Sequence, residues 1–249
     1  MTAMWAWLKR FYHQMGSPPH FFRWAGALAP YCMGLAAVLI IGGTISGLFF
    51  APADYQQGDA FRIIYVHVPS AYISLMAYTM MATAAGIGFI WRMKIAHAVA
   101  VSIAPIGAWF TFLALMTGAV WGKPMWGTYW QWGDARMVSE LVLLFLYLGY
   151  LALRAAFDDR DKADRISAVL AVVGVVNVPI IHYSVNWWAT LHQGPTISKI
   201  GSPSITTDML LPLLAMILGF TFLFGWLVLR HTQCEVLERE TGSRWIREL

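Results

Sequence analysis

Residues 121–140 read WGKPMWGTYWQWGDARMVSE, and a long apolar run stands on either side of them. This stretch holds four tryptophans within twelve positions: Trp121, Trp126, Trp130 and Trp132. Tryptophan is ordinarily enriched at membrane–water interfaces, where the ring is buried and its N–H stays wet. Two or three tryptophans would be explained as such anchors, whereas four predict a flat aromatic surface on which something lies.

The composition of the 249-residue chain excludes an ordinary water-soluble domain. Hydrophobic residues make up 59% and charged residues 12%, and the mean hydropathy is +0.58. Such a chain cannot cover itself with polar side chains, so an integral membrane protein is predicted. No signal-peptide cleavage pattern opens the sequence, and the first apolar run is expected to stay in the mature protein. Cys32 and Cys234 lack CxxC or CxxCH spacing, which argues against a disulfide framework and covalent haem attachment.

Six apolar runs reach the length of about 20 residues that a helix needs to cross about 30 Å of hydrocarbon. They cover residues 28–50, 66–90, 98–120, 138–156, 166–185 and 208–229. We therefore expect an all-α integral membrane protein, with residues 1–249 forming a single domain of six transmembrane helices. Pro105, Pro179 and Pro212 lie inside these runs, where they are expected to kink the helices rather than break them.

The 17 Lys and Arg residues fall unevenly on the two sides of the predicted bundle. Thirteen lie on one side: Lys9, Arg10, Arg23, Arg92, Lys94, Arg154, Arg160, Lys162, Arg165, Arg230, Arg239, Arg244 and Arg247. Four lie on the other: Arg62, Lys123, Arg136 and Lys199. The positive-inside rule then predicts cytoplasmic termini and an outward-facing Trp-rich segment between the third and fourth helices. The net charge of +4 follows this topology and does not indicate nucleic-acid binding.

Two histidines on separate outer segments accompany the tryptophans. His67 precedes Pro69, and since proline fits the first turn of a helix, His67 is expected at the outer mouth of the second span. The segment after the fifth span carries His192 together with Trp187 and Trp188. Six of the 13 tryptophans therefore gather on the outer side, close to two imidazoles.

An aromatic surface flanked by two imidazoles suits haem. The macrocycle is a wide apolar plate, and its iron takes one or two imidazole ligands. Zinc, copper or non-haem iron would normally recruit more His, Cys or carboxylate ligands than these segments offer. Haem also carries two propionates, for which Arg62 and Arg136 are the natural candidates, because a guanidinium binds a carboxylate bidentately.

Each of these features also has an ordinary explanation. A lone histidine at a helix mouth is more often a hydrogen-bonded interfacial residue than a ligand. Trp187 and Trp188 could equally be interface anchors. His182 is more simply explained as a histidine bonded within the bundle, and Glu140 as a carboxylate favoured by the helix dipole at the start of the fourth span.

The quoted stretch and its neighbours resemble a known family. WGKPMWGTYWQW…DARMVSELVLLFLY is similar to the tryptophan-rich WWD signature of haem-handling membrane proteins. The resemblance narrows to the cytochrome c maturation family CcmC, or haem exporter protein C, through FAPADYQQGDAFRIIYVHVPS, APIGAWFTFLALMTGAVWGKPMWG and NVPIIHYSVNWWATLHQGPT. It covers about residues 50–195, with matching length and six-span topology, whereas the larger haem lyases carry many more spans.

The resemblance implies that haem b is held as cargo at the periplasmic surface of the bacterial inner membrane. His67 of the YVHVP motif and His192 of the LHQG motif would be the axial ligands, and residues 121–138 the haem-binding segment. The haem would be presented to CcmE, a periplasmic chaperone that bonds covalently to a haem vinyl group. CcmA, CcmB and CcmD would complete the complex. Because this chain has no GxxxxGK[ST] loop, no ATPase and no independent catalytic activity is predicted for it.

The chain departs from the family pattern at one position. The family reads W-x-W-D, whereas Gly133 separates Trp132 from Asp134 here. One extra residue turns Asp134 and Arg136 by about 100° in a helix, or to the other face of a strand. A glycine permits compensating backbone geometry, so both residues stay in the predicted haem site.

Two other functions fit parts of this pattern. A bis-histidine cytochrome b that transfers electrons would need ligands at the middle of the spans, and the spans offer none there. A transmembrane haem channel would need polar or ligating groups along an interior path, and the spans offer mainly Ser, Thr and Gly. A factor that presents haem to a chaperone is therefore the predicted function.

Overall fold

The computed structural model describes residues 5, 14, 16–192, 194 and 204–248, and every regular element among them is a helix. Six helical segments are long and apolar enough to cross a membrane, which confirms the predicted number of spans. They are α2 (Pro18–Ile45) with η1 (Ser46–Phe50), η2 (Asp59–Ile63) with α3 (Ile64–Trp91), α4 (Lys94–Trp126), α5 (Ala135–Ala155), α6 (Arg160–Gly174) with α7 (Asn177–Trp187), and α8 (Thr207–Arg239). A short 3-10 helix, η3 (Arg244–Glu248), follows α8.

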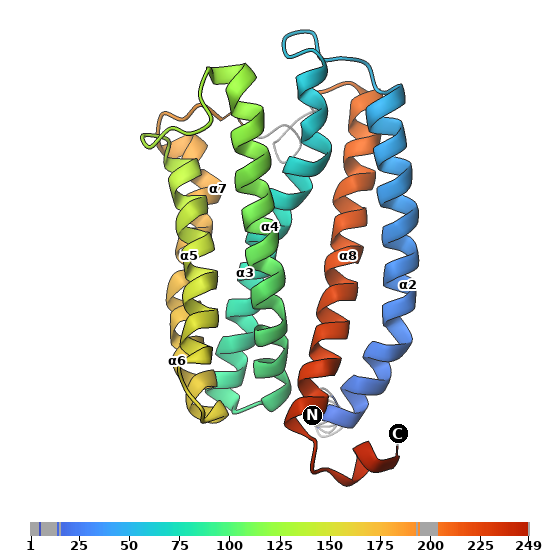
Figure 1. Ribbon diagram of the computed structural model, residues 1–249, viewed down its shortest axis with the longest axis vertical. Coiled ribbons are helices and arrows are strands. Elements are labelled where there is room, and N and C mark those ends of the chain that lie inside the picture. The colour runs from blue at the N-terminus through green and yellow to red at the C-terminus, as the bar shows by residue number, and fades with distance from the viewer. Residues whose placement is uncertain (1–4, 6–13, 15, 193, 195–203, 249) are drawn as a thin grey trace.

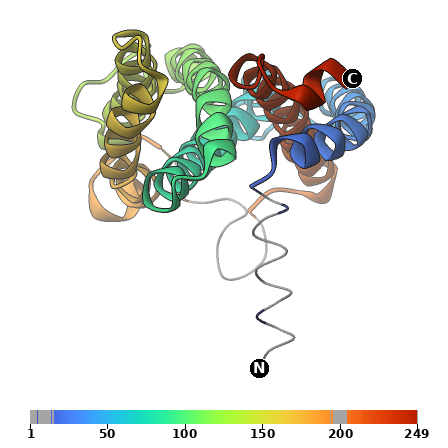
Figure 2. The ribbon, with the colours of Figure 1, turned by 90° about the horizontal axis from the view of Figure 1, so that it is seen from below.

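Two pairs of spans pack most extensively, α2 along α8 and α3 along α4, while α6 packs about equally against α3 and α5. Figure 1 shows α5, α6 and α7 on one side of α4, and α8 and α2 on the other. The view along the helices in Figure 2 places α3 and α4 between these two groups. The largest cluster of buried apolar residues accordingly joins the helices from α3 to α8, whereas α2 packs chiefly against α8.

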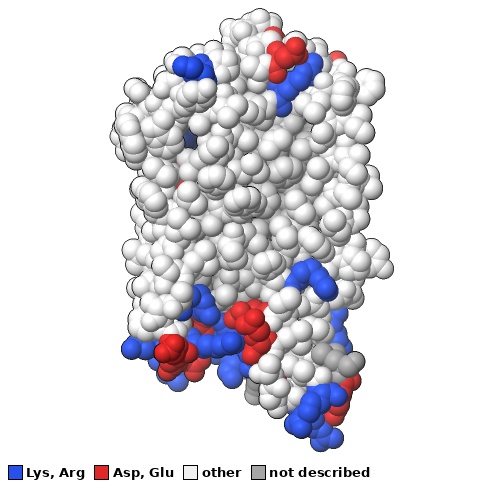
Figure 3. Space-filling view, viewed as in Figure 1, with Lys and Arg blue, Asp and Glu red and all other residues white. Residues whose placement is uncertain are grey.

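The two ends of the bundle differ in charge. Figure 3 shows that charged side chains crowd the end that carries the C-terminus in Figure 1, while the middle of this face is nearly free of them. We call this the basic end, and the opposite end, with residues 51–58, 127–134 and 188–192, the Trp end. Three residues of the predicted charge pattern lie outside the described residues: Lys9, Arg10 and Lys199.

A buried ion cluster joins three helices at the basic end. Asp164 of α6 is 2% exposed and accepts a hydrogen bond from Nη1 of Arg239 on α8 at 2.7 Å. Asp164 also pairs with Arg154 of α5, and Nε of Arg239 lies 2.7 Å from Oε1 of Glu235. Buried charges of this kind are tolerated only when they are paired. The cluster therefore ties α5 and α6 to α8, which otherwise packs against α2, α3 and α4.

The fifth span differs from its prediction, because it is two helices rather than one kinked helix. α6 ends at Gly174 and α7 begins at Asn177, so Pro179 occupies the first turn of α7. A proline there removes no helical hydrogen bond, whereas in a continuous helix it would do so. Nδ2 of Asn177 donates to the carbonyl oxygen of Ser139 on α5 at 2.9 Å, which anchors the break. The prolines of the third and sixth spans lie inside continuous helices, as expected.

Candidate functional site

A cleft lies at the Trp end, between α3, α4, α5 and α7. Five of the predicted site residues line it: His67, Trp126, Trp130, Arg136 and His192. Its other lining residues are Ala71, Leu75, Ala114, Leu115, Gly118, Ala119, Met137, Glu140 and Ile181. The mostly apolar lining with few polar groups is typical of small-molecule and cofactor sites. Two histidines from distant parts of the sequence thus share one cavity.

His67 lies deeper in the bundle than predicted. The helix does not begin at Pro69, because the 3-10 helix η2 leads directly into α3 at Ile64. Pro69 is therefore inside α3, and the membrane-spanning segment already begins at Asp59. His67 is half-buried in the wall of the cleft rather than at its outer rim.

The hydrogen bonds of His67 determine which ring nitrogen is free. Nδ1 lies 3.1 Å from the carbonyl oxygen of Ala114 and 3.0 Å from Oγ1 of Thr117. The Thr117 hydroxyl donates its own hydrogen to the carbonyl oxygen of Leu113 at 2.7 Å. Since a carbonyl oxygen only accepts, Nδ1 must carry the proton and Nε2 must carry the free lone pair. Gly118 gives the ring its room, because a Cβ there would lie 3.0 Å from Cε1 of His67.

His192 is held in place by Asp134. Asp134 caps α5, with Oδ1 accepting from the N–H of Met137 at 3.0 Å, and Oδ2 accepts from the N–H of Leu191 at 2.8 Å. Nδ1 of His192 lies 3.4 Å from Oδ1 of Asp134, within ion-pair distance but without hydrogen-bond geometry. The carboxylate thus fixes the backbone next to His192 and places a negative charge behind its ring. A carboxylate in this position is common behind histidines that ligate metals.

The pKa values of these two groups suit a neutral imidazole. Burial raises the pKa of Asp134, but the two backbone hydrogen bonds and the neighbouring His192 together hold it below its usual value. Burial lowers the pKa of His192, although the charge of Asp134 opposes the effect. His192 is therefore neutral at pH 7, as a metal-ligating imidazole must be.

The four tryptophans of residues 121–132 do not form one flat surface. α4 continues as far as Trp126, so Trp121 and Trp126 stand on a helix while Trp130 and Trp132 belong to the loop that follows. Trp126 and Trp130 line the cleft, and Trp121 packs edge-on against the His67 ring with centroids 5.6 Å apart. Trp126 and Trp130 therefore form walls of the cleft, and Trp121 supports the His67 ring.

Trp130 carries a polar atom that lacks a partner. Its Nε1 is buried and has no hydrogen-bond acceptor among the described residues. Its ring meets that of Trp132 at 70°, with centroids 5.4 Å apart, and Trp132 is 73% exposed. Because a buried donor without an acceptor is costly, Trp130 fits a cleft that takes a ligand with acceptor groups.

Arg136 and Glu140 bring charge into the cleft from one face of α5. Among the residues that the structure describes, the Arg136 guanidinium has no hydrogen-bond or ion-pair partner, so it is free to bind a ligand carboxylate. Glu140 is 8% exposed, and its Oε1 lies 2.7 Å from Oγ of Ser74 on α3. The helix-dipole explanation of Glu140 is wrong, since the residue lies beyond the first turn of α5. In the sequence, this pair could have been found from its spacing of four positions, which puts both side chains on one face of a helix.

Arg62 lies away from the cleft. Its Nη1 donates to the carbonyl oxygens of Gly47 at 2.7 Å and Ala51 at 3.0 Å, and its Nε pairs with Asp59 at 2.9 Å. The guanidinium therefore joins the end of η1 to the start of η2. This use leaves Arg136 as the only predicted arginine that lines the cleft.

Trp187, Trp188 and His182 also stand outside the cleft lining. Trp187 stacks on Tyr183 with centroids 5.4 Å apart, and both tryptophans are at least half exposed. His182 is exposed and meets the Tyr183 ring edge-on, so its explanation as a buried bundle histidine is wrong. This end of α7 presents its aromatic residues outward.

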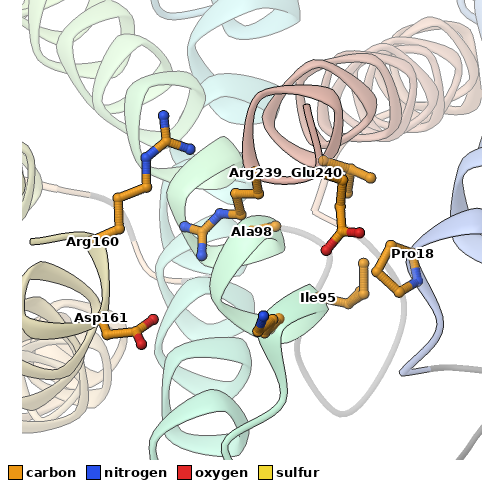
Figure 4. Close-up of a pocket in the computed structure, with 9 residues that line it drawn as sticks. Pro18, Ile95, Ala98, Arg160, Asp161, Arg239 and Glu240 are labelled. Atoms are coloured by element: carbon orange, nitrogen blue, oxygen red, sulfur yellow. The ribbon is translucent and has the colours of Figure 1, made fainter. Parts of the chain in front are cut away.

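A second hollow lies at the basic end (Figure 4). Arg160 and Asp161 of α6 reach it from one side, and Arg239 and Glu240 at the end of α8 from another. Its lining holds neither histidine nor cysteine and carries charges of both signs. No predicted site residue contributes to it.

The ligand set of the cleft fits haem better than a bare metal ion. Within the described residues, no group of three or more His, Cys, Asp or Glu side chains is placed to hold a metal ion. Haem iron already has four porphyrin nitrogens and needs only one or two protein ligands. Together, the fold and the cleft define a class: six-span helical membrane proteins with a cleft of imidazoles and tryptophans at one membrane surface.

Comparisons with known proteins specify the family. The chain matches the CcmC family, described as heme exporter protein C, over residues 11–247. It is 49% identical to "Heme exporter protein C" of Haemophilus influenzae over 246 residues, which are 99% of this chain and 98% of that protein. Identity to "Heme exporter protein C" of Escherichia coli K12 is 50% over 237 residues, or 95% of each chain. A "Putative cytochrome c biosynthesis ccmC-like mitochondrial protein" of Marchantia polymorpha is 40% identical over 216 residues, 87% of this chain and 90% of that one.

The chain belongs to the heme exporter protein C family, which confirms the resemblance seen in the sequence. It is therefore a multi-pass membrane protein with a role in haem handling for cytochrome c maturation, as part of the Ccm haem export system. Haem is the cargo of this system.

Proposed function

We propose that this protein binds haem b in the cleft at the Trp end, with His67 and His192 as axial ligands, and presents it at the periplasmic surface to the chaperone CcmE. The observation that carries the proposal is the support behind each ring. Nδ1 of His67 donates to Ala114, which leaves Nε2 of His67 free, and Nδ1 of His192 faces the carboxylate of Asp134. Ligating histidines are usually backed in this way by a carbonyl or a carboxylate.

The other cleft residues have separate tasks toward the cargo. Trp126 and Trp130 wall the macrocycle, and Nε1 of Trp130 offers a hydrogen bond. Arg136 binds a propionate, because its guanidinium lines the cleft and has no partner among the described residues. Arg62 supports the loop at the end of η1, and Trp187 and Trp188 serve as interface anchors.

The site is suited to holding a cargo that must leave. Two loops, residues 127–134 and 188–192, contribute Trp130 and His192, and loops open at lower cost than packed helices do. Trp132 stays exposed beside the cleft, where a partner can approach. In this proposal CcmA, CcmB and CcmD supply ATP-driven release, and this chain binds and orients haem without catalysing a reaction of its own.

An absorbance spectrum of the purified protein tests the ligand assignment. We expect His67→Ala and His192→Ala each to lose the spectrum of bis-histidine haem and most of the bound haem. His182→Ala is the matched control, because His182 is exposed at the same end and lies outside the cleft lining. Undiminished haem in both cleft variants would overturn the assignment.

Co-expression with CcmE tests the presentation step. Covalently loaded chaperone should accumulate with the wild-type protein and fall to background with either cleft variant. Loading that does not depend on this protein would instead favour a haem channel or an electron-transfer cytochrome.

A further inference from the structure

Ser74 has two close oxygen neighbours but only one hydrogen to give. Its Oγ lies 2.8 Å from the carbonyl oxygen of Ala71 and 2.7 Å from Oε1 of Glu140. A serine hydroxyl has a single hydrogen, and a carbonyl oxygen cannot donate one. If Glu140 were ionised, one of these two contacts would lack a hydrogen of its own. Both contacts are satisfied when Glu140 is protonated and donates to Ser74, while Ser74 donates to Ala71.

The surroundings of Glu140 give a negative charge no direct partner. No hydrogen bond or ion pair joins Glu140 to Arg136 on the same helix in the described structure, although the two are close enough for their charges to interact. From α3, His67 uses Nδ1 for its contacts with Ala114 and Thr117, and no hydrogen bond joins it to Glu140 among the described residues. From α5, the Tyr147 hydroxyl donates to the carbonyl oxygen of Ser74 at 2.9 Å, so its hydrogen is already used.

The remaining walls near Glu140 are apolar. α4 contributes Ala114, Leu115, Gly118 and Ala119 to the cleft, and α7 contributes Ile181. At the mouth, Asp134 and His192 face each other. The other tyrosine of this region, Tyr78 on α3, is fully buried against the Tyr147 ring. An ionised carboxylate in such a place is unfavourable unless it is paired, so a neutral acid is the stable form.

We propose that Glu140 is a protonated acid that makes the cleft selective for an anionic, carboxylate-bearing tetrapyrrole. Glu140 and Arg136 lie one turn apart on the same face of α5, so an ionised Glu140 would compete with the cargo for the guanidinium. It would also repel the propionates through a medium of low dielectric constant. A neutral Glu140 leaves the positive charge of Arg136 to the cargo. The selectivity of the cleft rests on the proposed function, whereas the protonation of Glu140 is a property of the protein without haem.

Carbon-13 NMR of the haem-free protein in detergent tests the proton directly. Glutamate labelled at the side-chain carboxyl carbon gives signals from five residues: Glu140, Glu235, Glu238, Glu240 and Glu248. We expect one signal at pH 7 to show the shift of a protonated acid and to vanish in Glu140→Gln. The four glutamates of the basic end are internal controls. A Glu140 signal at the shift of an ionised carboxylate would overturn the proposal, whatever the protein binds.

Haem titration of the wild type and Glu140→Gln then tests the selectivity. The two proteins should bind haem equally at a pH below the ionisation seen by NMR. Above it, we expect the wild type to bind about tenfold more weakly, because the new charge repels the propionates, while Glu140→Gln keeps its affinity. Glu240→Gln, at the other end of the bundle, should follow the wild type. Parallel curves for the wild type and Glu140→Gln would overturn the selectivity. A wild type that binds no haem would overturn the proposed function. The carboxyl carbon signal would still show whether Glu140 is protonated.

Discussion

Gly133 shows how one extra residue can be accommodated without moving the site. The N–H of Asp134 bonds to the carbonyl oxygen of Gln131 at 3.1 Å, which closes a turn around Trp132 and Gly133 before α5 begins. The added residue therefore lies in the turn and not in the helix. Asp134 still caps α5, and Arg136 still faces the cleft in the described structure.

Asp134→Asn should weaken haem binding by about 10–100-fold, the usual cost of losing a partner behind a metal ligand. The amide cannot place a negative charge behind His192, and its nitrogen cannot accept from the N–H of Leu191. Asparagine caps a helix about as well as aspartate, so the cap of α5 should be kept. Haem titration of the purified protein measures the effect.

The matched control for this variant is Asp159→Asn. Asp159 caps α6 by accepting from the N–H groups of Asp161 and Lys162, at the basic end and away from the cleft. It should likewise keep its cap, and it should keep its haem affinity. Equal haem affinity in Asp134→Asn and the wild type would contradict the positioning role of Asp134.

The helices themselves were predictable from the sequence because apolar length alone determines what can span a membrane. Their ends were not, since local turns decide them: η2 carries the second span back to Asp59, and α4 runs on to Trp126. How deep His67 and Glu140 lie in the bundle depends on where the helices begin and end. Contacts across helices, such as Thr117 behind His67, depend on how each helix is rotated, which apolar length does not determine.

The pairing of α2 with α8 depends on close backbone approach. A Cβ at Gly219 of α8 would lie 2.8 Å from Cγ1 of Ile40 and 3.1 Å from its backbone nitrogen. Small residues at helix contacts in membranes allow this approach. Gly219→Ala should therefore force α2 away from α8 and lower stability by about 1–3 kcal/mol, the usual cost of overpacking. Thermal unfolding in detergent measures it.

Gly34→Ala on α2 is the control, because a Cβ there meets nothing within 4 Å. Both substitutions gain the same helix propensity, so the difference between them isolates the packing. α2 does not line the cleft, and both variants should keep their haem spectrum. A Gly219→Ala protein as stable as Gly34→Ala would contradict this prediction, because α2 and α8 could then move apart without loss of stability.

The two ends of the molecule differ in structure: buried ion pairs join the helices at the basic end, and the cleft lies at the Trp end. At the basic end, Asp164 and its arginine partners join α5, α6 and α8 through buried ion pairs. At the Trp end, the loop before α5 and the loop after α7 contribute Trp130 and His192 to the cleft. A cargo can then enter and leave at one end while the helices stay joined at the other.

The excess of Lys and Arg at the basic end predicts that this end is cytoplasmic and that the cleft faces the periplasm. Two cysteine positions can test this prediction. Cys234 is exposed on α8 near the basic end, and Tyr129 is 57% exposed in the loop at the Trp end. In a Cys32→Ala background, a membrane-impermeant thiol reagent should label Cys234 only after intact cells are permeabilised. With Cys234 also replaced by Ala, Tyr129→Cys should be labelled in intact cells. The reverse pattern would put the cleft on the cytoplasmic side, where a periplasmic chaperone could not reach the haem.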